Sequence, residues 1–161
     1  MRSYKDRTFD IVYVIEALCY STNKEVVFKE VRRVLKSNGY FIIFDGYRSS
    51  KKLSRDEEIA CKLTEKSMAV QSFEIYKDVI QKAFKQHFVL DYEENLSKYV
   101  LPTMKRFEKL SKVYIKFPLI SRLVTKILPM EFSANSIAGY FMPNLIEGKI
   151  AQYMVTVLKS S

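Results

Sequence analysis

The sequence has little of the chemistry that metal centres and disulfide-rich folds require. Its 161 residues include only two cysteines, Cys19 and Cys61, and one histidine, His87. The cysteines form no CxxC pair and no cluster with histidine, so a zinc site or a disulfide framework is unsupported. We interpret Cys19 as a small structural side chain, and we expect no catalysis from His87, which lacks a partner motif. The chain is expected to be reduced and cytoplasmic.

Long apolar runs are also missing. No stretch of about 18 uninterrupted apolar residues occurs, so no transmembrane helix is expected. Residues 1–10 are polar and charged. We therefore expect no signal-peptide core at this end of the chain.

The composition that is present indicates a folded α/β domain. Apolar residues make up 48% and charged residues 28% of the chain, a balance that allows one compact hydrophobic core. The net charge is +9. This surplus favours anionic partners or reflects a solvated basic surface. The basic residues are scattered and no nucleic-acid recognition motif occurs, so the sequence argues against a nucleic-acid binder.

The first third of the chain has the pattern of a strand, a helix and a strand. Residues 10–15 are apolar and rich in β-branched side chains, which is typical of a strand buried on both faces. Thr22 and Glu25 have the spacing of a capping box at a helix start. Gly39 is expected to end that helix in the left-handed conformation, before a second buried strand over residues 40–44.

Further elements follow in the order helix, helix, strand, helix, helix and strand. Together with the first three, they predict a single α/β domain over residues 1–161. The next helix is expected to begin with a capping box at Ser54 and Glu57, and the one after it is expected to be capped by Ser72. A strand over 88–90 and a long basic helix with Pro102 at its first position follow, with breaks at Pro118 and Pro129. The last elements are a helix over 133–146, shifted by Pro143 and stopped by Gly148, and a final strand over 150–158.

Three segments resemble a known family. The run from Phe9 to Leu18 is similar to the fourth strand and following loop of class I S-adenosylmethionine-dependent methyltransferases, especially enzymes of the sterol-methyltransferase type. Residues 31–43 resemble the next helix, turn and fifth strand, with Lys-Ser-Asn-Gly where the family has Lys-Pro-Gly-Gly. Residues 148–159 resemble the last, antiparallel strand. The resemblance implies the last four strands of a Rossmann-like sheet with flanking helices.

The chain departs from the family in one major respect. It contains four glycines, and none lies in the glycine-rich turn that brings the backbone close to the cofactor. By the resemblance, the first three strands are missing and the strand over residues 10–15 is a bare, apolar edge. We expect a truncated gene product, a half that docks on a separate amino-terminal half-domain, or a homodimer that pairs through residues 10–15.

Site residues follow from the carboxyl ends of the expected strands, where open α/β sheets bind ligands. The resemblance implies that Ile15, Glu16 and Ala17 contact S-adenosylmethionine. Glu16 could instead cap the next helix. Tyr20, Asp45 and Tyr47 are candidate substrate-binding residues; Tyr20 could also pack as an aromatic wall, and Asp45 could satisfy turn amides. The sequence identifies no catalytic residue.

Residues 100–147 correspond to the variable substrate cover of the family. Within them, residues 105–126 combine basic and apolar side chains at helical spacing. Such a segment suits an anionic membrane surface, a lipid-like acceptor, or a core-facing helix with a solvated basic face.

Two functions stay open at this point. The resemblance implies methyl transfer to a small, apolar or amphipathic molecule, for which the protein mainly positions the partners and excludes water. The alternative is an inactive half-domain that joins a partner chain through its exposed strand edge.

Overall fold

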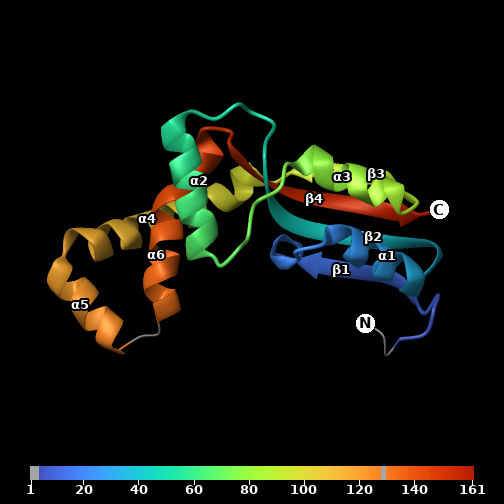
Figure 1. Ribbon diagram of the computed structural model, residues 1–161, viewed down its shortest axis with the longest axis horizontal. Coiled ribbons are helices and arrows are strands. Elements are labelled where there is room, and N and C mark those ends of the chain that lie inside the picture. Colours follow the sequence, from blue (N-terminus) through green and yellow to red (C-terminus); the bar gives the residue numbers. More distant parts are fainter. Residues whose placement is uncertain (1–3, 128–129) are drawn as a thin grey trace.

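A four-stranded sheet forms the body of the molecule (Figure 1). The computed structural model describes residues 4–127 and 130–161. The strands are β1 (Phe9–Ile15), β2 (Leu35–Arg48), β3 (Phe88–Asn95) and β4 (Ala151–Ser160), and they lie in the order β1-β2-β4-β3. β1 and β2 are parallel, whereas β4 is antiparallel to both of its neighbours. This confirms the expected partial Rossmann-like sheet with an antiparallel final strand.

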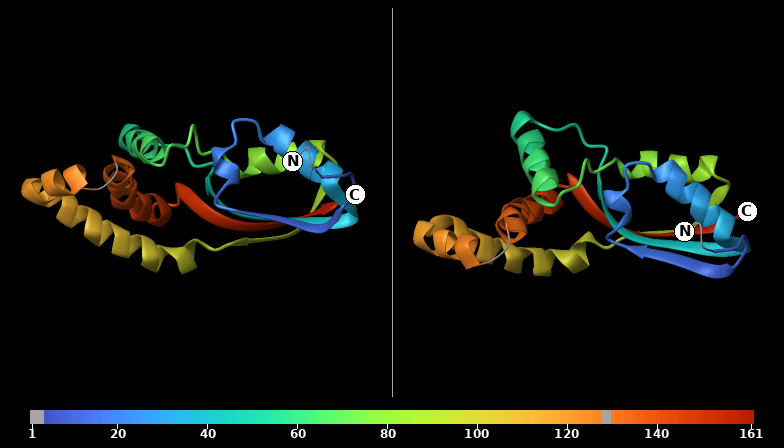
Figure 2. Two further views of the ribbon diagram at one scale, coloured as in Figure 1. Left: turned by 90° about the horizontal axis from the view of Figure 1, so that it is seen from below. Right: turned by 60° about the horizontal axis from the view of Figure 1, so that its bottom comes forward.

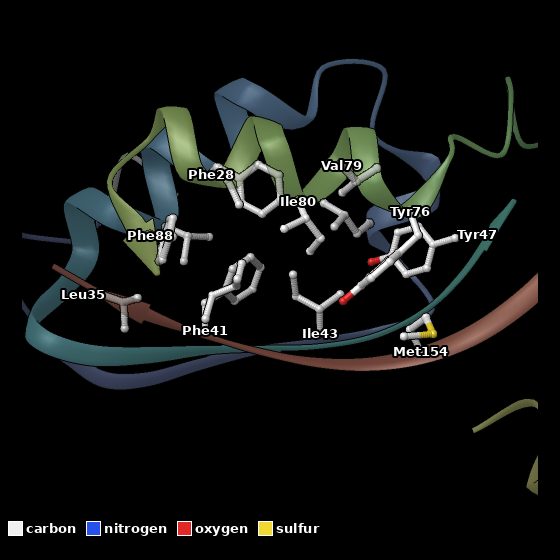
Figure 3. Close-up of a cluster of buried hydrophobic side chains, with 14 residues drawn as sticks. Phe28, Leu35, Phe41, Ile43, Tyr47, Tyr76, Val79, Ile80, Phe88 and Met154 are labelled. Carbon is white, nitrogen blue, oxygen red and sulfur yellow. The ribbon is translucent and has the colours of Figure 1, made fainter. Parts of the chain in front are cut away.

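Helices α1 (Lys24–Val34) and α3 (Tyr76–Lys85) cover one face of this sheet (Figure 3). Their apolar positions recur at helical spacing and meet the alternate residues of β2 that point to the same side. The centre of this core is aromatic. The ring of Phe28 on α1 lies 6.0 Å from that of Phe41 on β2 and 6.1 Å from that of Phe88 on β3, all three with edge-on or tilted geometry.

The opposite face of β1 is bare (Figure 2). Its side chains Ile11, Tyr13 and Ile15 are 54%, 70% and 57% exposed. The prediction that residues 10–15 are buried on both faces is therefore wrong, because only Val12, Val14 and Phe9 of this strand pack on the core. The prediction that β1 is a sheet edge is confirmed by the strand order.

A second group of helices extends beyond the sheet, at the end where β1 and β2 finish and β4 begins (Figure 1). It consists of α2 (Arg55–Ser67), α4 (Ser97–Lys116), α5 (Pro118–Ile127) and α6 (Met130–Glu147). Cys61, Leu145 and Ile150 form a small buried cluster that joins this group to the start of β4. Within the described residues, no helix has both the length and the hydropathy needed to cross a bilayer.

Several local predictions are wrong at the helix ends. α1 is capped by Asn23, whose side chain accepts the Val26 amide, and not by Thr22. α3 begins after Ile75, without a side-chain cap, and Ser72 lies outside it. The capping box of Ser54 and Glu57 on α2 is confirmed. α4 starts at Ser97, so Pro102 lies inside the helix rather than at its first position.

The α1–β2 connection also differs from the prediction. The left-handed residue is Asn38, with φ 62°, and no glycine has a positive φ. Gly39 is required for another reason. A Cβ at this position would lie 2.9 Å from the main-chain oxygen of Asp10, closer than real Cβ atoms approach. Glycine therefore lets β1 and β2 come together at the start of their pairing.

The helical segment after β3 contains one helix more than predicted. α5 begins at Pro118, which confirms a break there, while Pro129 lies outside the described residues. α6 continues through Pro143 without interruption and ends before Gly148, whose amide bonds the Asn144 carbonyl at 2.8 Å. The strands β2, β3 and β4 are all longer than the predicted runs, since cross-strand pairing extends them beyond their apolar centres.

Candidate functional site

The loop after β1 lies at the carboxyl edge of the sheet. Glu16 is its first residue and has a positive φ of 48°, a left-handed conformation that costs a non-glycine residue about 1 kcal/mol or more. Its amide donates to the Phe44 carbonyl at 2.8 Å, which completes the parallel ladder. The Glu16 side chain is thereby turned toward β4.

Glu16 meets Tyr153, the third residue of β4. The Tyr153 hydroxyl donates to Glu16 Oε1 at 3.1 Å. The phenol pKa of Tyr153 is raised by partial burial and by the neighbouring Glu16 carboxylate, so this hydroxyl stays protonated as a donor. Sequence patterns did not predict this pair, because the position of Tyr153 opposite the loop after β1 depends on how β4 pairs with β2 in the folded sheet.

Asp45 on β2 contacts the same loop through its side chain. It is buried, and its Oδ2 accepts the Cys19 amide at 2.9 Å while its Oδ1 accepts the Gly46 amide at 2.8 Å. Burial raises the pKa of the Asp45 carboxyl, and the amide hydrogen bonds offset part of that rise. Asp45 therefore positions the 3₁₀ turn η1 (Leu18–Tyr20); its role as a substrate ligand stays a prediction.

Cys19 lies in that turn beside Asp45. Burial and the adjacent Asp45 carboxylate raise the pKa of the Cys19 thiol to about 12. The thiol is therefore protonated near neutral pH and is a poor nucleophile, in agreement with the structural interpretation of this residue. His87 lies at the start of β3, at the other end of the sheet from Glu16.

The remaining predicted residues separate into exposed and buried ones. Tyr20 is exposed at the end of η1, at the surface of the loop. Tyr47 is buried on the face covered by α1 and α3, where its ring lies 5.2 Å from that of Tyr76 (Figure 3). Among the described groups, the Tyr47 hydroxyl has no hydrogen-bond partner. The structure thus brings Glu16, Asp45 and Tyr153 to one edge, while the Tyr47 ring points into the core.

A narrow cavity of about 40 Å³ begins beside Tyr153. It is lined by the end of β2 at Gly46–Arg48, by the start of β4, and by side chains of α4 and α6. Met104 on α4 and Met142 on α6 are among the side chains that line it. Of the Glu16–Tyr153 pair, Tyr153 therefore contributes to the wall of this cavity.

A much larger cavity shares the same two methionines in its lining. It has a volume of about 600 Å³ and lies between α4, α6 and the end of α2. Its lining is mostly apolar, with a few polar groups that include Ser111, Asn135 and Ser136. A volume in this range and an apolar wall with few polar groups are typical of sites for small organic molecules. Sequence patterns did not reveal this cavity, since its wall combines residues of three helices.

Ile15, Glu16 and Ala17 are all exposed and line neither cavity. Their main-chain groups and the Glu16 carboxylate form an open surface, on which the carboxylate is the group that could accept a hydrogen bond from a cofactor's amino group. They do not enclose a molecule of the size of S-adenosylmethionine. The described residues also contain no group of three or more His, Cys, Asp or Glu side chains that could hold a metal ion.

The sheet order, the antiparallel last strand and the loop after β1 define the carboxy-terminal part of a class I S-adenosylmethionine-dependent methyltransferase fold. The family model of the methyltransferase domain matches residues 1–43. These residues form β1, η1, α1 and the first part of β2, so the sequence match covers the loop that carries Glu16.

Curated relatives are similar over parts of the chain. Sterol methyltransferase-like 3 of Botryococcus braunii is 49% identical over 43 residues, which cover 27% of this chain and 11% of that protein. The 24-methylenesterol C-methyltransferase 3 of Arabidopsis thaliana is 30% identical over 97 residues, which cover 59% of this chain and 27% of that protein. The chain thus matches between about a tenth and about a quarter of the length of these relatives.

Solved structures match the whole chain in fold. The cyclopropane synthase MmaA2 from Mycobacterium tuberculosis has a TM-score of 0.76 at 10% identity, covering 98% of this chain and 57% of that one. Geranyl diphosphate C-methyltransferase from Streptomyces coelicolor A3(2), solved with S-adenosyl-L-homocysteine, has a TM-score of 0.68 at 11% identity, covering 98% and 48%. The chain spans about half the length of these structures, and S-adenosylmethionine is the cofactor of the class.

Proposed function

We propose that this chain provides the acceptor-binding part of an S-adenosylmethionine-dependent methyltransferase that acts on an apolar small molecule. The observation that carries the proposal is the apolar cavity of about 600 Å³, which shares the lining residues Met104 and Met142 with the narrow cavity at Tyr153. An elongated molecule held in the large cavity would extend one end past these flexible methionines to the Glu16–Tyr153 edge.

The comparisons support an apolar acceptor. The relatives matched by sequence are named sterol methyltransferases, and a fold neighbour is named for geranyl diphosphate, an isoprenoid. Sterols and isoprenoids are bulky and largely apolar, as is the lining of the large cavity. The few polar groups of that lining, such as Ser111 and Asn135, suit a single hydroxyl or similar group at one end of the molecule.

Methyl transfer requires the protein to position the two reactants, and it does not require a catalytic triad. When bound, S-adenosylmethionine supplies a methyl group that is already activated on a sulfonium centre. In the proposed enzyme, the helical group holds the acceptor and keeps water away from it. Asp45 fixes the loop through the Cys19 amide, and Tyr153 orients the Glu16 carboxylate at the edge where the two ligands meet.

Binding of a fluorescent sterol, dehydroergosterol, tests the acceptor site. Val113 and Ile115 are both half-exposed on α4, and only Val113 lines the large cavity. Val113→Trp is expected to fill part of the cavity and weaken sterol binding about tenfold, equal to ~1.4 kcal/mol, while Ile115→Trp leaves it unchanged. Equal affinity of both variants and the wild type would contradict an acceptor site in this cavity.

A second function is favoured by the bare face of β1. We propose, as the alternative, that the chain is an inactive half-domain that pairs with a partner chain through this strand. The strand has an unpaired edge and exposed apolar side chains at Ile11, Tyr13 and Ile15. Both features are typical of a strand that pairs with another chain. Homodimers through the same edge belong to this alternative.

Sedimentation velocity distinguishes the two proposals when combined with the sterol titration. The alternative predicts association of the wild type that is lost in Tyr13→Lys and retained in Val89→Lys, an exposed position on β3 at the other edge of the sheet. It also predicts no saturable sterol binding. A monomer that binds sterol supports the first proposal and excludes self-pairing through β1.

A further inference from the structure

Helix α5 presents its apolar face to solvent. Leu119, Leu123 and Ile127 follow one another at intervals of four residues, so they share one face of the helix, and they are 80%, 59% and 70% exposed. An amphipathic helix of a globular domain normally turns this face to the core. Leu110 on α4 and Phe117, which follows the last residue of α4, are also exposed.

The same region is strongly basic. Residues 105–127 contain seven basic residues and one acidic residue, Glu108, so their net charge is +6. Lys112 pairs with Glu108 at 2.7 Å, and Lys105 pairs with Glu147 on α6. All seven basic side chains are exposed: Lys105, Arg106, Lys109, Lys112, Lys116, Arg122 and Lys126.

The large cavity opens at this surface. Leu110 and Val113 line the cavity and are at the same time 66% and 48% exposed. α4, α5 and α6 lie at the end of the molecule away from the sheet (Figure 1). A molecule that approaches this end meets the apolar residues of α4 and α5 before it reaches the interior.

We propose that the second half of α4 together with α5, here called the α4–α5 arm (residues 105–127), docks on the surface of an anionic lipid bilayer. Leu119, Leu123 and Ile127 enter the boundary between headgroups and acyl chains, and the basic side chains contact lipid phosphates and carboxylates. A cluster of apolar and basic residues of this kind is complementary to an anionic bilayer, which has an apolar interior and a negatively charged surface. Two copies of the arm would instead bring like charges together, which disfavours self-association.

Docking would place the mouth of the large cavity beside the lipid. Membrane apolar molecules could then enter the cavity without crossing water. This consequence rests on the proposed acceptor-binding function, whereas docking of the arm does not, so the two can be tested separately.

The experiment is co-sedimentation of the whole chain with vesicles of phosphatidylcholine alone and of phosphatidylcholine mixed with phosphatidylserine. Binding is expected only with phosphatidylserine and is expected to weaken as salt is added. One variant replaces three lysines of the arm: Lys109→Gln, Lys116→Gln and Lys126→Gln. Each lost charge should lower the partition coefficient about fivefold, so the triple variant should lower it roughly 100-fold. Its control, Lys29→Gln, Lys77→Gln, Lys85→Gln on α1 and α3, changes the net charge equally and should leave binding within about twofold.

Apolar insertion is tested by Leu119→Gln with Leu123→Gln, which should abolish vesicle binding. The control pair Val26→Gln with Val89→Gln removes similarly exposed apolar side chains from α1 and β3 and should bind normally. All four positions are exposed, and circular dichroism checks that each variant is folded.

Three results would overturn the proposal. They are absence of binding to phosphatidylserine vesicles at low salt, equal loss in the arm variants and their controls, and a dimer that Leu123→Gln converts to a monomer without change in vesicle binding. Leu119 and Leu123 are not among the described residues that line the cavity, so their variants should still bind dehydroergosterol in the absence of vesicles. Failure of docking and failure of acceptor binding are therefore distinguishable.

Discussion

Tyr153 and Glu16 are 137 residues apart in the chain, and the Tyr153 hydroxyl donates to the Glu16 carboxylate at 3.1 Å. This hydrogen bond joins the loop after β1 to the start of β4 across β2, which lies between the two strands. It places the Glu16 carboxylate next to Tyr153, which lines the narrow cavity. This one hydrogen bond therefore both links two parts of the fold and orients the carboxylate on which the proposed function depends.

A double-mutant cycle measures this pair. Tyr153→Phe removes the donor and Glu16→Ala removes the acceptor of this hydrogen bond, and their effects on the free energy of unfolding should be non-additive by about 0.5–1 kcal/mol, a small value because the pair is partly exposed. Urea denaturation of the wild type, the two single variants and the double variant gives the coupling. Strict additivity would show that the contact contributes nothing in solution.

Gly39 allows the close approach of β1 and β2. Gly39→Ala brings a Cβ to 2.9 Å from the Asp10 carbonyl oxygen, so we expect a loss of about 1–3 kcal/mol in the free energy of unfolding. Gly46→Ala is the matched control on the same strand, because its Cβ would meet only the Phe73 ring at 3.8 Å. Denaturant unfolding compares the two, and a Gly46 variant that is the less stable of the pair would contradict this explanation.

The Asp45 carboxyl predicts a pH dependence of stability. Its folded-state pKa is raised by burial above the ordinary value of 3.8, so the folded chain holds this proton more tightly than the unfolded chain. The stability that it contributes is present below pH 3.8 and is lost as the pH rises through the raised pKa. The stability of the wild type relative to Asp45→Asn should therefore fall as the pH increases from 3.8.

Urea denaturation of the wild type and Asp45→Asn across the acid and neutral range measures this difference. A difference that grows with pH would mean that the amides of Cys19 and Gly46 stabilise the carboxylate more than burial destabilises it.

Cys19 should be slow to react. Its thiol pKa of about 12, against an ordinary 9.0, leaves about 1000-fold less thiolate at pH 8 than an ordinary cysteine has, and burial limits access further. Alkylation with iodoacetamide, followed by peptide mass spectrometry, should modify Cys19 in the folded chain far more slowly than in urea. Rapid modification of the native chain would reopen a nucleophilic role for this residue.

The sequence predicted the parts of the fold that depend on local apolar patterns. The β-branched run at residues 10–15 and the capping box at Ser54 both lie where they were expected. Other predictions failed where tertiary packing decides. Asn23 caps α1 where Thr22 was expected, and Asn38 takes the left-handed position expected of Gly39. Gly39 is needed instead because the approach of β1 to β2 leaves no room for a Cβ at residue 39.

The candidate site was predicted only in part. Glu16 and Asp45 could be found because both follow apolar strands, and the carboxyl ends of parallel strands lie at one edge of a sheet. Tyr153 could not be found, since its position opposite Glu16 depends on the register of β4. The large cavity depends on how three helices pack, and its methionines Met104 and Met142 carry no sequence signature.

The central claim is that an apolar acceptor occupies the large cavity and reaches the Glu16–Tyr153 edge. NMR spectra of the chain with labelled tyrosine rings, recorded during titration with dehydroergosterol, test it most directly. We predict shifts at Tyr114, which lines the large cavity, and at Tyr153, which lines the narrow one, while the exposed Tyr13 on β1 is unchanged. Saturable binding that leaves both Tyr114 and Tyr153 unshifted would contradict the claim.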